Sequence, residues 1–551
     1  MAVVVLFLHL GSAALFEPDE GRNAEKAREI LVLNDWITPH ENFHPVLDKP
    51  IFFYWLIALA YKIFGISEWA ARLPSALAAL SCIGVIYWFV RRRWDLWAAQ
   101  WSGLILLTSL GFFVLARIVI FDMNLTLFLA LALCAFYEGA RADDLTRRRI
   151  FCLILYASLA IATLIKGLIG IVLPGMVIFF YLLITKQWFL LRRIYLIPGV
   201  ILFLAVVIPW YLKVDAVNPG YLRYYFWDEH FGRFTSAEFN RSEPWYYFIW
   251  VGMVSFFPWT LLLPFMAGRY RKNTFDDKTI FITLWCVLPF LFFSASDSKL
   301  PHYILPVLPA LSILTAVALS YRYESSSARV NFALSLVALT QGLITLYVVL
   351  GSVWPAILAP AIRDAVTDNA HILWIYAVVI TAFLFFLLVQ SLWRLLGMGK
   401  LYLIHSVSVL LFFLFITHVI VLAAPQRSAL PLAKIVASRL TPATQVVFFD
   451  TYQAGMAFYL RTEKPLWVVT HANKKRTFLG NYYAIAGHPE PTPPGGKALL
   501  DFEEFQSRWE TATQPLLIIV KTKNLPRLEE RVGKSLKQIG ATGEYLVMTK
   551  P

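Results

Sequence analysis

The chain has 551 residues, of which 59% are hydrophobic and only 15% are charged, and its formal net charge is +14. A soluble protein of this length would be about half apolar and a quarter charged, so the composition excludes an ordinary soluble enzyme and predicts a polytopic α-helical membrane protein. The positive charges fall in short clusters between apolar runs rather than in one basic patch, which argues against nucleic-acid binding.

Apolar runs long enough to cross a bilayer predict about thirteen transmembrane helices. We expect them near residues 1–16, 72–90, 96–115, 122–140, 150–165, 168–185, 195–212, 245–266, 279–294, 302–320, 331–350, 372–394 and 401–423. With the amino terminus inside, the arginine clusters at 91–93 and 147–149 fall in the cytoplasm, as the positive-inside rule requires. The first run lacks the basic start of a signal peptide, and a cleaved leader is the alternative reading.

The first long connection, residues 17–71, is expected outside the cell membrane. Its segments "RNAEKAREILVL" and "KPIFFYWLIALAYKIFG" have helical character, and we expect both helices to lie along the membrane interface. If the second crossed the bilayer, the later arginine clusters would turn outward. After Ala424, short β-like runs such as "TQVVFFDTY" and "PLLIIVKTK" alternate with polar segments. The sequence therefore predicts a transmembrane domain over residues 1–424 and a small extracytoplasmic α/β domain over residues 425–551.

Ionisable residues gather in the outer loops and at the outer ends of the predicted spans. Asp19 and Glu20 open the first outer helix, where they either cap the helix or act as a catalytic pair. Asp122 stands in an apolar stretch, where an unpaired charge is costly, and we expect Arg117 or a basic residue of the first loop as its partner. Lys49 either snorkels toward headgroups or contributes to a phosphate cradle. Further groups expected on the same face are Arg22, His230, Arg233, Lys299, His302 and Tyr303.

A carboxylate, a phosphate cradle and access from the bilayer are what sugar transfer from a lipid-linked donor requires. Cations would stabilise the leaving phosphate, and a carboxylate would position or deprotonate the acceptor or support the cationic sugar. One alternative is a transporter or flippase for a lipid-linked substrate, which would need charges near the bilayer midplane and an inverted repeat. Another is a membrane oligosaccharide ligase or polymerase.

Seven motifs carry a resemblance to a known superfamily. They run in order from Pro18 to Pro306 and are "PDEGRNAE", "DKPIFFYW", "RIVIFDMNLT", "IKGLIG", "DEHFGRF", "EPWYYF" and "SKLPHYILP". Together they resemble the GT-C superfamily, in the branch of the lipid A aminoarabinose transferases and the protein O-mannosyltransferases. The resemblance implies an inverting glycosyltransferase of the bacterial inner membrane, with its active site and carboxy-terminal domain in the periplasm. The donor would be an undecaprenyl-phosphate-linked sugar and the acceptor lipid A or another periplasmic molecule.

Roles are expected for individual residues, some from the resemblance and others from their positions in the outer loops. The expected catalytic acids are Asp19, Asp122 and Glu20. The expected contacts to the donor phosphate are Lys49, Arg22, Arg233, Lys299 and Tyr303. Other substrate contacts are expected from Tyr54, His302 and Glu243. A divalent metal, zinc or magnesium, is expected at Asp48 and His230, although related transferases often carry glutamate where this chain has Asp48.

Overall fold

The computed structural model describes residues 2–232, 243–264, 276–320, 328–358, 363, 366–367, 374, 378, 381–382, 385, 398–470, 496–533 and 536–550. The chain divides into two compact units. The first unit comprises Met1–Leu10, Arg72–Pro209 and His230–Ala423, and the second comprises Gly11–Ala71, Trp210–Glu229 and Ala424–Pro551. The division predicted at residues 424 and 425 stays a prediction, because both units collect segments that are far apart in the sequence.

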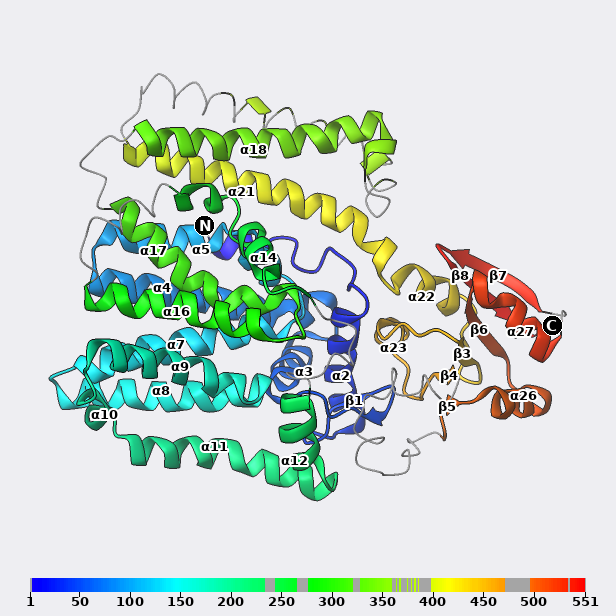
Figure 1. Ribbon diagram of the computed structural model, residues 1–551. Helices are drawn as coiled ribbons and strands as arrows, with labels where there is room; N and C mark the ends of the chain where they lie inside the picture. Colours follow the sequence, from blue (N-terminus) through cyan, green and yellow to red (C-terminus); the bar gives the residue numbers. More distant parts are fainter. Residues whose placement is uncertain are drawn as a thin grey trace. The chain divides into compact units, whose positions relative to one another are not determined.

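The first unit is a bundle of apolar helices (Figure 1). The helices that lie wholly or mostly in it are α1 (Ala2–Phe7), α4 (Glu68–Arg93), α5 (Leu96–Leu107), α6 (Leu110–Leu115), α7 (Phe121–Arg141), α8 (Leu145–Lys166), α9 (Ile169–Thr185), α10 (Leu190–Arg193), α11 (Leu196–Val217), α14 (Tyr247–Ser255), η2 (Trp259–Leu262), α16 (Asp277–Ala295), η3 (Pro301–Val307), α17 (Leu308–Ser320), α18 (Ala328–Val353), η4 (Pro355–Ile357) and α21 (Met398–Ala423). Figure 1 shows α7, α8 and α9 side by side. The hydrophobic core of the whole bundle includes the buried side chains of Phe89, Ile105 and Leu133.

Within the described residues, seven helices are long and apolar enough to cross a membrane. They are Glu68–Arg93, Phe121–Arg141, Leu145–Lys166, Leu196–Val217, Asp277–Ala295, Pro301–Ser320 and Val407–Arg427. Shorter apolar helices include Leu96–Leu107 and Ile169–Thr185. The predicted class, a polytopic helical membrane protein, is confirmed. The span predicted near residues 372–394 lies almost entirely outside the described residues.

The helix predicted over residues 1–16 is shorter than expected at its carboxyl end, because α1 ends at Phe7. The Arg117 guanidinium donates hydrogen bonds to the carbonyl groups at the carboxyl end of this helix. Its Nη1 donates to the carbonyl oxygens of Val5 and Leu6 at 2.8 and 3.0 Å, and its Nη2 donates to that of Leu8 at 2.7 Å. These carbonyls would otherwise be unsatisfied at a helix end inside apolar surroundings. A cation from a distant segment therefore caps the carboxyl end of α1.

The predicted span at residues 96–115 is divided in two. Helix α5 ends at Leu107, and the hydroxyl groups of Thr108 and Ser109 donate to the carbonyls of Leu104 and Ile105. Such hydroxyl bonds to the preceding turn compete with the backbone and favour a break in the helix. Helix α6 then begins at Leu110.

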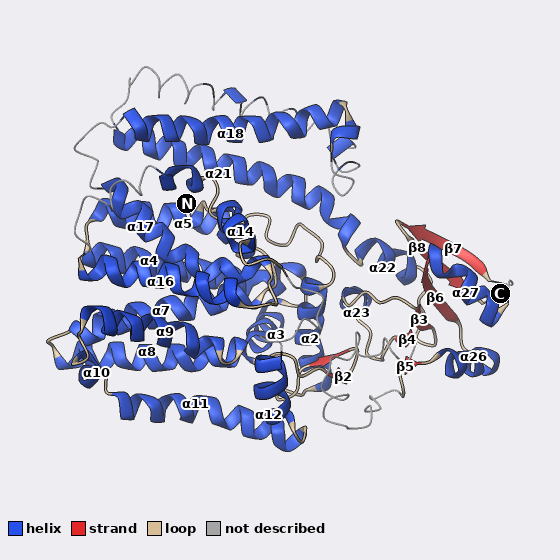
Figure 2. Cartoon of the chain, in the orientation of Figure 1, coloured by secondary structure: helices blue, strands red, loops and turns tan. Residues whose placement is uncertain are grey.

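The second unit contains a mixed six-stranded sheet in the order β5-β4-β3-β6-β8-β7. The strands, red in Figure 2, are β3 (Gln445–Phe449), β4 (Trp467–Val469), β5 (Leu499–Leu500), β6 (Leu516–Lys521), β7 (Lys537–Thr542) and β8 (Tyr545–Thr549). The first four in that order are parallel, and β8 and β7 are antiparallel to their neighbours. Every residue of β3 is buried, as expected for a parallel strand covered on both faces.

Helices cover both faces of this sheet. Helices α22 (Leu430–Ala437) and α23 (Gly455–Leu460) pack on one face with Phe448, and α26 (Phe502–Thr511) and α27 (Leu525–Val532) pack on the other with Phe449. The α/β fold predicted for this segment is therefore confirmed. The other elements of the second unit are α2 (Asp19–Leu33), β1 (His40–Glu41), β2 (His44–Pro45), α3 (Phe52–Phe64), α12 (Tyr221–Arg223), η1 (Tyr224–Gly232), η5 (Ala424–Arg427) and η7 (Thr522–Asn524).

Glu17 links the first loop to the carboxy-terminal α/β segment, and the pKa of its carboxyl group is raised. Its Oε1 accepts from the Gly455 amide at 2.7 Å, and its Oε2 accepts from the Ala454 amide at 3.1 Å. Burial raises the pKa of Glu17 to about 7, although these two amides act to lower it. The folded protein therefore keeps the Glu17 proton over a pH range in which the unfolded chain has already released it.

We expect the free energy of unfolding to fall as the pH rises from about 4.5 to about 7 and to level off above that range, since the unfolded state binds fewer protons in the window. Thermal unfolding of the detergent-purified protein across this range measures the effect. Glu17→Gln should show a smaller drop. Glu29, whose pKa is also raised by burial, contributes equally to both proteins, so the comparison isolates Glu17. Equal slopes in the two proteins would contradict the prediction.

Candidate functional site

A buried ion pair marks the amino-terminal end of α7 in the first unit. Asp122 is only 2% exposed, and its Oδ1 accepts from the Lys166 ammonium at 2.5 Å. The His302 Nε2 lies 3.6 Å from Asp122 Oδ2. The Lys166 Nζ also lies 4.3 Å from the centre of the Tyr303 ring. We call these four residues the Asp122 cluster.

The sequence brings the Asp122 cluster together by ending or starting a helix at each of its members. Helix α8 ends at Lys166 because Gly167 takes a φ of +75°, a conformation that glycine adopts without steric cost. Helix α7 starts after the extended residue Ile120, which places Asp122 in its first turn. Helix η3 starts with Pro301 and presents His302 and Tyr303. Three helix ends therefore contribute to one polar site inside an apolar bundle.

Asp122 is the costly buried charge that its apolar surroundings predict, but the partner expected for it is wrong. Arg117 caps α1, as described above, and a lysine missed as a site residue forms the ion pair. The signal for Lys166 was present in the "IKGLIG" motif, which places a lysine between two predicted spans. A cation at such a turn is expected to meet a counter-charge or the membrane surface.

An ion pair with so little exposure is better explained by function than by stability. Taking both charges out of water costs free energy that their attraction often fails to recover. Ionisable residues inside membrane proteins are accordingly rare and tend to mark functional sites. The Asp122 cluster offers one carboxylate, one lysine amine, one imidazole and one phenol, a set suited to a charged substrate.

A second polar cluster lies in the second unit, on α2 and the segment that follows it. Arg22 Nε donates to Glu41 Oε1 at 3.1 Å, and Lys26 Nζ lies 3.0 Å from Asp48 Oδ1 and 3.8 Å from Glu41 Oε2. The Glu41 carboxylate is the main cause of the raised pKa of Arg22. Lys26 also lies 5.7 Å from the ring centre of Tyr54, whose pKa is raised by burial. We call these five residues the Arg22 cluster.

Two predicted catalytic acids of the first loop have different surroundings. Asp19 is exposed at the first position of α2. Glu20 is buried, and its Oε2 accepts from the amide of Phe16 at 3.1 Å, which ties its side chain to the start of the helix. The catalytic roles of both stay predictions, and the contact of Glu20 agrees with the capping alternative. Lys49 Nζ donates to the carbonyl of Asp48 at 3.0 Å.

Lys299 holds two loop segments of the first unit together. Its ammonium donates to the carbonyls of Ser296 at 2.5 Å and Glu243 at 2.7 Å, and the residue is 5% exposed. Glu243 itself is exposed. A contact of Lys299 with the donor phosphate stays a prediction. Arg233 and the side chain of His230 lie outside the described residues.

The predicted site residues belong to both units. Asp122, Lys299, His302 and Tyr303 are in the first unit. Asp19, Glu20, Arg22, Asp48, Lys49 and Tyr54 are in the second. The structure brings together Asp122, His302 and Tyr303 in one cluster and Arg22, Asp48 and Tyr54 in the other. The predicted convergence of all these residues on one substrate stays a prediction.

The metal expected at Asp48 and His230 stays a prediction, because the His230 side chain lies outside the described residues. Among the described side chains, no group of three or more histidine, cysteine, aspartate or glutamate residues could hold a metal ion. Asp48 faces the Lys26 ammonium at 3.0 Å, which fills the place of a cation beside this carboxylate. No step below depends on a divalent metal.

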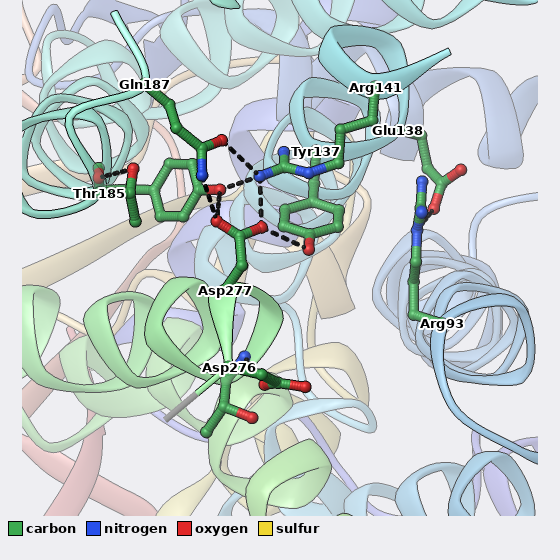
Figure 3. Close-up of polar contacts among 10 residues, drawn as sticks. Arg93, Tyr137, Glu138, Arg141, Thr185, Gln187, Asp276 and Asp277 are labelled. Atoms are coloured by element: carbon green, nitrogen blue, oxygen red, sulfur yellow. Dashed lines mark hydrogen bonds and ion pairs between the residues drawn. The ribbon is translucent and has the colours of Figure 1, made fainter. Parts of the chain in front are cut away.

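The opposite end of α7 carries another polar cluster (Figure 3). The carboxylate of Asp277 accepts from Tyr137 at 3.0 Å, Arg141 at 2.5 Å, Tyr181 at 2.5 Å and Gln187 at 2.8 Å. These residues lie at the ends of α7, α9 and α16 or next to them. Four donors to one carboxylate leave it little capacity for a substrate, so this cluster fastens helix ends together.

Comparison with known proteins bears on the predicted class of fold. A family model described as dolichyl-phosphate-mannose-protein mannosyltransferase matches residues 48–212. That range contains Asp122 and Lys166, the ion pair of the Asp122 cluster. The class expected from the motifs, a GT-C glycosyltransferase fold in a polytopic membrane protein, is confirmed.

Among individual proteins, the chain is similar in sequence to bacterial arabinosyl transferases. The undecaprenyl phosphate-alpha-4-amino-4-deoxy-L-arabinose arabinosyl transferase of Enterobacter sp. (strain 638) is 30% identical over 317 residues, which is 57% of this chain and 57% of that protein. A second such transferase, from Pseudomonas fluorescens, is 32% identical over 337 residues, 60% of this chain and 57% of that protein. The match thus spans little more than half the length of these curated relatives.

Solved structures extend the likeness to the whole chain. ArnT from Cupriavidus metallidurans in the apo state has a TM-score of 0.83 and 28% identity, covering 100% of this chain and 96% of that one. The same protein bound to undecaprenyl phosphate gives a TM-score of 0.82 with the same coverage. The chain is therefore ArnT-like in fold, as the motifs predicted.

Proposed function

We propose that this protein is a glycosyltransferase that moves a sugar from an undecaprenyl-phosphate donor to a phosphate group of lipid A. The observation that carries the proposal is the chain-long likeness to ArnT bound to undecaprenyl phosphate, at a TM-score of 0.82. The names of the curated relatives favour 4-amino-4-deoxy-L-arabinose as the sugar. The proposed setting is the periplasmic face of the bacterial inner membrane. This setting agrees with the cytoplasmic position that the positive-inside rule predicts for the arginine clusters.

In the proposed reaction, an oxygen atom of the acceptor phosphate attacks C1 of the sugar. The bond from C1 to the donor phosphate oxygen breaks, its electron pair stays with the departing undecaprenyl phosphate, and the configuration at C1 inverts. A phosphate acceptor is already anionic near neutral pH, so it needs no general base. The demands on the protein are to orient both substrates and to balance the charges of the transition state.

Each of the two polar clusters contains charged groups of the kind that this reaction needs. The Asp122 carboxylate supports positive charge that develops on the sugar ring as the bond breaks. Cations stabilise the negative charge that develops on the leaving phosphate. The cations proposed for this role are Lys166 of the Asp122 cluster, Arg22 of the Arg22 cluster, Lys49, Lys299 and Arg233.

A second candidate function follows from the family model, whose description names a protein mannosyltransferase. Transfer to a serine or threonine hydroxyl would need a base to remove the hydroxyl proton, unlike transfer to phosphate. Asp19, an exposed carboxylate, would be the first candidate for that base.

Mass spectrometry separates these functions. The purified protein would be given a polyprenyl-phosphate-linked aminoarabinose with lipid A and, in parallel, a polyprenyl-phosphate-linked mannose with a serine- and threonine-rich peptide. A mass gain of one aminoarabinose on lipid A supports the proposal, and a mannose on the peptide supports the second candidate. Movement of the donor across vesicle membranes without any product would instead indicate a transporter.

Lys49→Ala is expected to raise the KM for the donor several-fold while leaving the KM for the acceptor nearly unchanged. The reason is that a cation next to the donor phosphate contributes to donor binding alone. Steady-state kinetics with each substrate varied in turn measures both constants. Lys62→Ala is the matched control, because this exposed lysine lies in the last turn of helix α3 in the same loop. A larger effect on the acceptor would contradict a role at the donor phosphate.

A further inference from the structure

The segment that leads into α2 is held by the carboxy-terminal part of the second unit. We propose that Glu17, Gly21 and Gly455 are positioning residues, through which the carboxy-terminal α/β segment fixes the first turn of α2 and the direction of the Asp19 carboxylate. This inference rests on the proposed function, because it gives Asp19 a part in sugar transfer. It also assigns a role to the α/β segment.

Four hydrogen bonds fix the chain immediately before Asp19. The Glu17 carboxylate accepts from the amides of Ala454 and Gly455, as described above. The Glu17 amide donates to the carbonyl of Arg427 at 2.9 Å. The Leu15 amide donates to the Tyr459 hydroxyl at 2.8 Å. Both main chain and side chain are thus held, so the entry to α2 has little freedom to rotate.

The glycines allow the two backbones to touch. A Cβ atom added at Gly455 would lie 2.4 Å from Glu17 Oε1, and one added at Gly21 would lie 2.8 Å from the Gly455 nitrogen and 2.9 Å from its Cα. These separations are far below van der Waals contact, and the Gly21 contact is with backbone, which cannot swing aside. Gly21 is two residues after Asp19, in the same helical turn. A side chain at Gly21 must push that turn away, whereas one at Gly455 must displace the Glu17 carboxylate and lies 3.3 Å from the Gly21 Cα.

The rest of the first loop is held by the same α/β segment. Arg28 Nη2 donates to the carbonyl of Thr462 at 2.7 Å. Asn42 and Leu466 exchange two hydrogen bonds, at 2.9 and 2.8 Å. The far end of α2 therefore stays anchored when the first turn is displaced, and a substitution at Gly455 acts locally. Residues that act in catalysis need this kind of support, because errors of about 1 Å cost large factors in rate.

Gly455→Ala tests the proposal in the full-length protein. We expect kcat for sugar transfer to fall about tenfold to a hundredfold, with smaller changes in the KM of donor and acceptor. We also expect faster hydrogen exchange of the amides in residues 19–24, with unchanged exchange near Arg28. Gly175→Ala is the matched control, since a Cβ at that position meets nothing within 4 Å. It should leave both measurements as in the wild type.

Glu17→Gln provides a second variant in case Gly455→Ala fails to fold, because it keeps the size of the side chain. It should give the same faster exchange in residues 19–24 and an intermediate loss of kcat. Wild-type exchange and wild-type kcat in either folded variant would overturn the proposal, as would a loss of kcat with unchanged exchange. If the wild type transfers no sugar from any donor, the proposed function fails, whereas the exchange data still show whether these contacts fix the first turn.

Discussion

Replacing Asp122 with asparagine is expected to lower sugar transfer by about a hundredfold to a thousandfold, because the neutral amide no longer balances the positive charge of the sugar in the transition state. The same change leaves the Lys166 ammonium buried without its counter-ion. Breaking one side of a buried pair costs about 3–5 kcal/mol, so we also expect a lower unfolding temperature. Single-turnover transfer with labelled donor and thermal unfolding in detergent measure the two effects.

Two further variants separate the effect on catalysis from the effect on folding. Asp277→Asn changes a carboxylate at the opposite end of the bundle and should lower stability while sparing transfer. Combining Asp122→Asn with Lys166→Met removes both charges and should recover stability without recovering transfer. Normal turnover in Asp122→Asn would remove this carboxylate from the mechanism.

Asp19→Asn is expected to reduce transfer to the background level with almost no change in stability. Asp19 is exposed, so the substitution neither leaves a buried charge nor opens a cavity. Loss of activity without loss of stability is the mark of a residue that acts on substrate. The measurements are product formation over long incubations and the unfolding temperature of the purified protein.

Glu503→Gln is the matched control for Asp19→Asn. Glu503 is also an exposed acid in the first turn of a helix of the second unit, so its contribution to helix stability is comparable. We expect it to leave transfer and stability unchanged. If Asp19→Asn behaves like this control, Asp19 serves only the start of α2.

The class of fold could be predicted because its causes are local in the sequence. Apolar runs, the arginine clusters between them and the β-like runs after Ala424 each reflect a few neighbouring residues. The errors occurred where distant segments meet. Arg117 caps the carboxyl end of α1 from more than a hundred residues away, and nothing within residues 1–16 signals this contact.

In the candidate site, too, features set by neighbouring residues could be predicted, whereas contacts between distant segments could not. Asp122 could be identified because its own surroundings are apolar, so its charge had to be paired. Its partner could not, since Lys166 lies 44 residues farther along the chain and its position depends on how α8 packs against α7. Glu20 was ambiguous from the sequence because capping and catalysis favour the same acidic residues at a helix start. Its contact with Phe16 agrees with capping, and its catalytic role stays a prediction.

The contact between Glu17 and Gly455 also has a consequence for biosynthesis. The two residues are 438 positions apart, so the contact forms only after the ribosome has synthesised most of the protein. The apolar helices emerge earlier and can enter the bilayer one by one. A nascent chain released before Gly455 would therefore be inserted in the membrane while its first loop still lacked this anchor.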